Sequence, residues 1–70
     1  MLVKRSLALS GHRTSVALEP EFWDALADLA RRRGQSLTTL VAAVDKQRGA
    51  DQPLASALRV LALAEARKDV

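Results

Sequence analysis

The chain has 70 residues and no cysteine, so it is the size of one small domain and neither a disulfide nor a thiolate metal site can stabilise it. Apolar residues make up 49% of the sequence, more than so small a monomer readily buries, which favours a homodimer. Three of the eleven Lys and Arg precede residue 19, where there is no acid, and the other eight are balanced by eight Asp and Glu. The net charge of +3 therefore belongs to the N-terminal segment, which suits a polyanion such as DNA or RNA, or an acidic membrane face.

Residues 12–18 alternate between two faces and predict a short strand, preceded by an N-terminal arm or extra strand at residues 1–11. The face expected to enter the core consists of Thr14, Val16 and Leu18. The face expected to stay exposed consists of Arg13, Ser15 and Ala17. One strand cannot satisfy its own backbone donors and acceptors, so we expect it to pair with the same strand of a second copy.

The dipeptide Ser10-Gly11 leaves a second pairing open, because it suits a two-residue hairpin turn. In that hairpin the cross-strand pairs would be Leu9 with His12, Leu7 with Thr14, Arg5 with Val16 and Val3 with Leu18. Most apolar residues would then share one face, although Arg5 would join them. Such a hairpin is compatible with a dimeric ribbon that it flanks; otherwise the first residues are an arm that becomes ordered on DNA.

Three helices are predicted after the strand, over residues 20–33, 36–48 and 53–67. Pro20 suits the first turn of the first helix, with Glu19 as the flanking cap, and Gly34 suits the left-handed residue after its end. Ser36 is placed to cap the second helix with its hydroxyl. The third helix has so narrow a polar strip that we expect it to be buried on more than one side, as in the core of a dimer.

The sequence offers no constellation for catalysis or metal binding. His12 is the only histidine, it has no carboxylate at ligand spacing, and no glycine-rich phosphate loop is present. We therefore expect no enzyme and no cofactor. Lys4-Arg5 precedes an apolar run too short for a signal peptide, and no stretch approaches the roughly 20 apolar residues of a membrane span, so we expect a cytoplasmic protein without membrane contact.

The order of strand, helix, glycine-containing turn and Ser-capped helix resembles the ribbon-helix-helix proteins, the Arc- and MetJ-like dimers that lay a two-stranded ribbon in the major groove of DNA. Several segments are similar to those of a group of small, mostly uncharacterised bacterial members. These segments are Lys4-Arg5-Ser6, Gly11-His12-Arg13-Thr14-Ser15-Val16, Leu18-Glu19, Phe22-Trp23-Asp24-Ala25-Leu26, Ser36-Leu37 and Ser56-Ala57-Leu58-Arg59. The resemblance implies a mainly α fold with one short strand, built as an intertwined homodimer with a two-stranded antiparallel ribbon and an extra C-terminal helix.

The resemblance also implies a sequence-specific DNA-binding protein, a small transcriptional regulator, and assigns its contacts. It assigns contacts with base edges to Arg13, Ser15 and Ala17. Ala17 departs from the family's pattern, in which a long or polar side chain is common, because alanine can only touch a thymine methyl or sit over the groove. The expected contacts with DNA phosphates are Lys4, Arg5, Gln35, Ser36 and Leu37, of which the last three lie at a helix N-terminus. Two alternatives stay open: an antitoxin-like module whose C-terminal helix binds another protein, and a dimeric structural domain that binds no nucleic acid.

Overall fold

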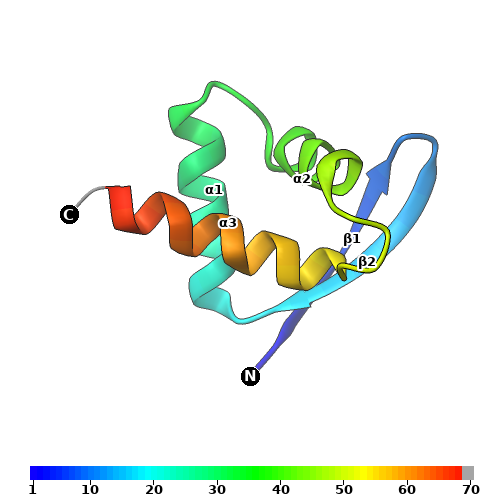
Figure 1. The fold of residues 1–70 in the computed structure, drawn as a ribbon, viewed down its shortest axis with the longest axis horizontal. Helices are drawn as coiled ribbons and strands as arrows, with labels where there is room; N and C mark the ends of the chain where they lie inside the picture. The colour runs from blue at the N-terminus through cyan, green and yellow to red at the C-terminus, as the bar shows by residue number, and fades with distance from the viewer. Residues whose placement is uncertain (69–70) are drawn as a thin grey trace.

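A two-stranded antiparallel hairpin, formed by β1 (Val3–Leu9) and β2 (His12–Leu18), opens the fold (Figure 1). The computed structural model describes residues 1–68. Ser10 and Gly11 join the strands with φ angles of 46° and 83°, and this pair of positive values matches the right-handed twist of a hairpin. The cross-strand pairs run from Leu9 with His12 to Val3 with Leu18.

The prediction that the chain holds one short strand, whose partner must come from a second copy, is therefore wrong, whereas pairing of the other edge of β2 with a second copy stays a prediction. β1 supplies the partner of β2 within the chain, and the hairpin register that the sequence left open is confirmed, with Arg5 opposite Val16. Alternation along β2 is confirmed as well, because Val16 and Leu18 are buried while Arg13 and Ser15 are exposed. The intertwining of two copies concerns a second chain and stays a prediction.

Three helices follow the hairpin: α1 (Pro20–Arg32), α2 (Leu37–Gln47) and α3 (Leu54–Lys68). Each observed end lies within one residue of the predicted range. α1 begins at Pro20 and is followed by Gly34 at φ 68°, where Gln35 donates its backbone N–H to the Ala30 carbonyl at 2.9 Å. α2 has Ser36 as its N-cap, and the Ser36 hydroxyl accepts from the Thr39 N–H at 3.0 Å, as predicted.

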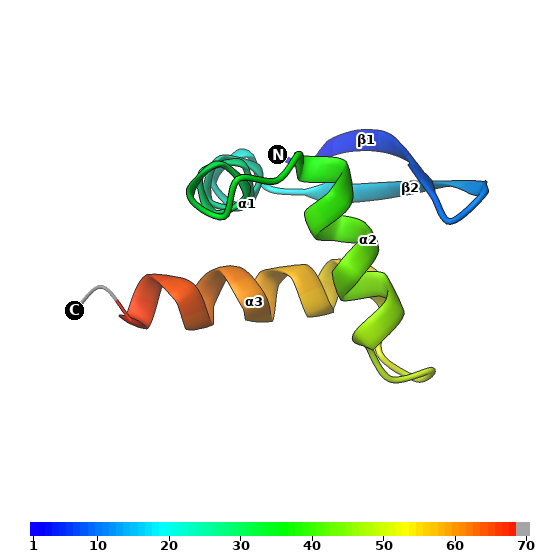
Figure 2. The same ribbon diagram turned by 90° about the horizontal axis from the view of Figure 1, so that it is seen from above.

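The helices cover one face of the hairpin and leave the other open (Figure 2). α2 packs on β1, α3 packs on β2, and α1 contacts both of these helices. The core lies between the two layers. Its largest fully buried side chains are Trp23, Leu9, Leu18, Leu26, Leu40, Leu58 and Val41. One face of the hairpin is thus fixed to the body of the domain, and only its outer face is available to a partner.

Within this chain α3 is buried on one side, and burial of a second side against another copy stays a prediction. Ala57, Leu58 and Ala62 face the core, whereas Val60 and Leu63 are 57% and 58% exposed. Part of the apolar surface of α3 therefore lies on the outside of the monomer. Among residues 1–68, no helix combines the length and the apolar character that crossing a bilayer requires.

Candidate nucleic-acid interface

The outer face of the hairpin combines the three predicted base-contacting positions of β2 with three positions of β1. Because side chains alternate along each strand, the six outward residues are Lys4, Ser6, Ala8, Arg13, Ser15 and Ala17. All are exposed except Ala17, which is half-buried. Cross-strand pairing sets Lys4 beside Ala17, Ser6 beside Ser15, and Ala8 beside Arg13.

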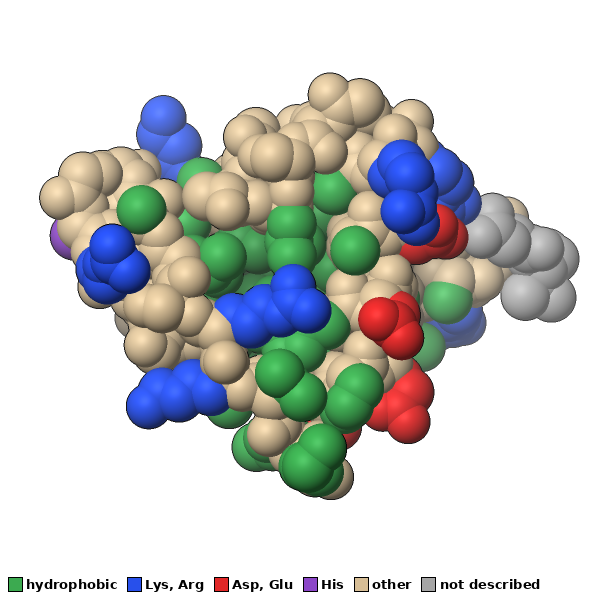
Figure 3. All heavy atoms as spheres, turned by 180° about the vertical axis from the view of Figure 1, so that it is seen from behind, with side chains coloured by type: hydrophobic (Ala, Val, Ile, Leu, Met, Phe, Trp, Pro, Cys, Tyr) green, Lys and Arg blue, Asp and Glu red, His purple; other side chains and the backbone are tan. Residues whose placement is uncertain are grey.

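This outer face is basic and lacks acid. Figure 3, which shows the molecule from behind, has Lys and Arg side chains on the hairpin side and apolar side chains at the centre, whereas the acidic side chains in view lie toward α1. Within the described residues, neither Lys4 nor Arg13 has an ion-pair or hydrogen-bond partner. Their charges are therefore free to bind an external anion, and two serine hydroxyls lie between them.

Lys4 and Arg5, the two predicted phosphate contacts on β1, lie on opposite faces of the strand. Arg5 is on the side that faces the helices. Its guanidinium carbon is 4.9 Å from the centroid of the Trp23 ring, a cation–π distance. Trp23 is 2% exposed, and its Nε1–H donates to the Val3 carbonyl at 2.8 Å. Trp23 therefore holds β1 to α1 at two points, and Arg5 contributes to that attachment.

The N-terminus of α2, which holds the predicted phosphate contacts of residues 35–37, is the end of that helix nearer the hairpin (Figure 2). The Gln35 N–H is already bonded to Ala30, and the Ser36 hydroxyl is bonded to Thr39 as both acceptor and donor. The backbone N–H groups of Leu37 and Thr38 have no acceptor among the described residues. These two donors, at the positive end of the helix dipole, are the groups that a phosphate could bind.

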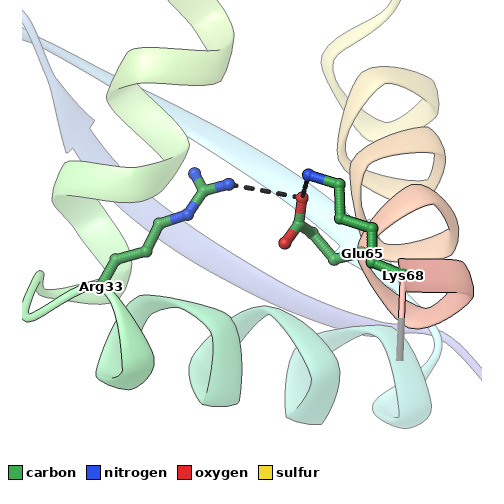
Figure 4. Close-up of polar contacts among 3 residues, drawn as sticks. All are labelled: Arg33, Glu65 and Lys68. Carbon is green, nitrogen blue, oxygen red and sulfur yellow. Dashed lines mark hydrogen bonds and ion pairs between the residues drawn. The ribbon is translucent and has the colours of Figure 1, made fainter. Parts of the chain in front are cut away.

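Two ion-pair clusters fix the helices beneath the interface. Arg59 of α3 lies 2.9 Å from the Glu19 carboxylate. The pKa of Glu19 is lowered mainly by a backbone hydrogen bond at Glu19 itself, and then by the hydrogen bond from Arg59. Glu65 of α3 binds Lys68 at 2.9 Å and Arg33, just after α1, at 3.5 Å (Figure 4). Lys68 is the main cause of the lowered pKa of Glu65.

The other charged residues considered from the sequence are the arginine run at the end of α1 and His12. Arg31 pairs with Asp28 at 2.7 Å and Arg33 with Glu65, so the arginine run at the end of α1 is partly committed to carboxylates. His12 is exposed at the start of β2. Residues 1–68 contain no group of three or more His, Cys, Asp or Glu side chains placed to hold a metal.

Sequence reasoning missed Ser6 and Ala8 as members of the outer face. Both become visible once residues 3–9 are read as a strand, because they alternate with Leu7 and Leu9. The hairpin at Ser10-Gly11, which the sequence left open, already implied this strand, but its outward residues were not drawn from it.

The chain belongs to the ribbon-helix-helix domain family, whose model matches residues 2–66. Among solved structures it is similar to an uncharacterized protein from Bordetella pertussis Tohama I, with 32% sequence identity and a TM-score of 0.76. That alignment covers 100% of this chain but only 62% of the Bordetella chain, which is therefore longer. No curated protein matches the sequence. Ribbon-helix-helix domains are typical of DNA-binding regulators and antitoxins.

Proposed function

We propose that this chain binds duplex DNA through the outer face of the β1–β2 hairpin, inserted in the major groove, and acts as a small sequence-specific transcriptional regulator in the cytoplasm. The observation that carries this proposal is that two exposed basic side chains without partners, Lys4 and Arg13, share one acid-free face of the hairpin with two serine hydroxyls, those of Ser6 and Ser15. The major groove, about 12 Å wide, admits a two-stranded ribbon. The family supports the same mode of binding.

Each outward residue of β2 has a defined chemistry toward base edges. Arg13 can donate two hydrogen bonds to the O6 and N7 atoms of guanine, and Ser15 can bond to either a purine or a pyrimidine edge. Ala17 can only contact a thymine methyl, so it contributes shape rather than hydrogen bonds. The N–H groups of Leu37 and Thr38 would hold a flanking phosphate and fix the register of the ribbon on the duplex.

The test is DNA binding by Arg13→Ala against Lys46→Ala, which removes one exposed positive charge at the far end of α2. Sequences selected from random duplex DNA serve as probes at two salt concentrations. Arg13→Ala should cost about 1–3 kcal/mol and relax the base preference, while Lys46→Ala should bind as the wild type does. Equal behaviour of the two variants, or no salt-dependent binding by the folded wild type, would refute the proposal.

We also propose that two copies associate through the groove between α1 and α3. This groove of about 350 Å³ is lined almost entirely by apolar groups, among them Phe22, Val60 and Leu63. Glu21 and Arg59 also line the groove and carry opposite charges, which suits a two-fold contact, although Arg59 is already bonded to Glu19 of its own chain. The residues that line the groove belong to the segment 19–70, whose formal charges cancel.

Mass measurement in solution tests this association. Leu63→Glu should convert a dimer into a monomer, and Leu2→Glu is the matched control because Leu2 is a similarly exposed leucine outside the groove. A monomeric wild type would refute the homodimer. A wild type that forms a defined complex with a different protein, lost in Leu63→Glu, would replace it with the antitoxin-like alternative.

A further inference from the structure

Two exposed apolar side chains lie next to each other on α3. Val60 and Leu63 are 57% and 58% exposed and three residues apart, so they form a ridge along one face of the helix. The other large apolar side chains that are exposed in residues 1–68, those of Met1 and Leu2, precede β1. The apolar surface that a helix or strand leaves open is therefore the α3 ridge, beside the groove that Val60 and Leu63 help to line.

The groove beside this ridge has one wall from α1 and one from α3, because the two helices pack against each other while crossing steeply (Figure 1, Figure 2). The α1 wall belongs to the N-terminal half of that helix and includes Glu21 and Ala25. The α3 wall extends along the helix to Ala66. A partner seated in the groove therefore contacts both helices at once.

The α1 wall is acidic. Residues 20–30 contain three acids, Glu21, Asp24 and Asp28, and no basic residue. All three are exposed, and their spacings of three and four residues place them on one face of α1. Asp28 is bonded to Arg31, whereas Glu21 and Asp24 have no ion-pair partner among the described residues.

The α3 wall is basic. Two of the three basic residues of α3, at positions 59 and 68, are already bonded to carboxylates of the same chain. Arg67 is exposed and has no ion-pair partner within residues 1–68. It follows Leu63 by four residues, so it extends the apolar ridge by one turn of helix. Each chain thus has unpaired acids on one wall and an unpaired arginine beside the other.

These charges distinguish two ways in which a two-fold axis can bring two such surfaces together. If α1 faced the α1 of a second copy, the acids would meet acids and Arg67 would meet the partner's Arg67, so like charges would repel at every contact. If α1 faces the α3 of the second copy, the acids meet the partner's Arg67. Symmetry makes that contact twice, and each apolar ridge then lies in the groove of the other chain.

We infer that a second copy of this chain occupies the groove with its α3 against α1, so that its ridge of Val60 and Leu63 is buried and its Arg67 lies beside Glu21 and Asp24. This inference rests on the proposed association of two copies. It adds which helices face each other and which side chains select the partner. The contact uses α1 and α3 alone, so it is compatible with any pairing at the edge of β2.

The experiment measures self-association of Glu21→Lys, of Arg67→Glu and of an equimolar mixture of the two by sedimentation equilibrium at low salt. Each variant alone should associate about tenfold more weakly than the wild type, because like charges then meet at both symmetry-related contacts. The mixture should recover wild-type strength. In a mixed pair the introduced lysine faces the introduced glutamate at one contact, and the native Glu21 faces the native Arg67 at the other.

Asp51→Lys and Lys46→Glu are the matched controls, because both residues are exposed and lie outside the groove. They should associate as the wild type does. If α1 faced α1, each reversal would replace one like pair by another, so single variants as strong as the wild type overturn the inference. A mixture that stays as weak as the single variants also overturns it. A wild type that does not associate, or that associates no better than Leu63→Glu, would instead refute the proposed groove contact.

The lack of cysteine in the chain allows a second measurement that does not depend on charge. Ala25 and Ala66 line opposite walls of the groove and are both exposed, so cysteine at either position disturbs no buried packing. A short thiol-reactive linker should join Ala25→Cys chains to Ala66→Cys chains. Preferential linking of Ala25→Cys chains to one another would show that α1 faces α1 and would overturn the inference.

Discussion

Replacement of Trp23 by phenylalanine tests how β1 is held to the domain. The substitution removes the hydrogen bond from the Trp23 Nε1–H to the Val3 carbonyl, at a cost of about 1 kcal/mol. It also removes part of a side chain that is 2% exposed, at a cost of about 1–2 kcal/mol. We therefore expect the free energy of unfolding to fall by about 2–3 kcal/mol, which lowers the melting temperature of so small a domain by at least about 8 °C.

The assay is urea unfolding followed by far-UV circular dichroism, because Trp23 is the only tryptophan and its fluorescence is lost in the variant. Phe22→Leu is the control, since Phe22 is a half-buried aromatic neighbour that contacts Arg59 at 5.7 Å instead of β1. Amide hydrogen exchange should accelerate along β1 in Trp23→Phe and not in Phe22→Leu. Equal exchange along β1 in both variants would show that Trp23 is a core residue with no particular hold on the strand.

The Arg5 side chain allows a second measurement of the same attachment. Arg5→Ala combined with Trp23→Leu in a double-mutant cycle should give a coupling of about 0.5–1 kcal/mol, the size of a partly exposed cation–π contact. Independent effects of the two substitutions would show that the 4.9 Å approach contributes nothing to stability.

Three further predictions concern the turn, a helix cap and acid stability. Ser10→Asn should stabilise the hairpin by about 0.5–1 kcal/mol in urea unfolding, because asparagine tolerates the positive φ of 46° better than serine does; a loss of stability would contradict the turn geometry. Ser36→Ala should cost about 1 kcal/mol through loss of the bond to the Thr39 N–H, and Ser36→Asp should retain most of it. The pKa of Glu19 is lowered from about 4.5, so its contribution to stability is present above pH 4.5 and is lost as the pH falls through the lower folded value. Glu19→Gln should flatten that part of the pH dependence of thermal unfolding, and an unchanged profile would mean that neither the backbone hydrogen bond at Glu19 nor the bond to Arg59 has a net effect.

Local signals in the sequence were sufficient for the helices and for the two faces of β2. Pro20 cannot donate a backbone hydrogen bond and so starts a helix, the Ser36 hydroxyl binds an N–H three residues ahead, and Gly34 adopts φ 68° without a Cβ clash. Each of these effects acts within one turn of chain. Alternation with period two likewise fixed which β2 side chains enter the core, whatever strand lies beside it.

Only the β2 half of the interface could be predicted from the sequence. Arg13, Ser15 and Ala17 follow from the alternation of β2 and from the family resemblance, but Ser6 and Ala8 depend on β1 being a strand. The sequence also grouped Lys4 with Arg5 as neighbouring positive charges. Because successive strand residues point to opposite faces, only Lys4 shares the outer face with Arg13.

The sequence alone therefore determined β2, the three helices, their ends and the location of the positive charge, since all of these depend on neighbouring residues. Only the tertiary structure decided the partner of β2, because the backbone groups of a strand pair equally well with a strand of the same chain or of another. The choice of β1 depends on contacts that are distant in sequence. The Trp23 hydrogen bond to Val3 joins residues 20 positions apart, and the same ring accepts Arg5 on a face that is mainly apolar. Packing of α2 and α3 on the two strands then leaves a single face of the hairpin open to a partner.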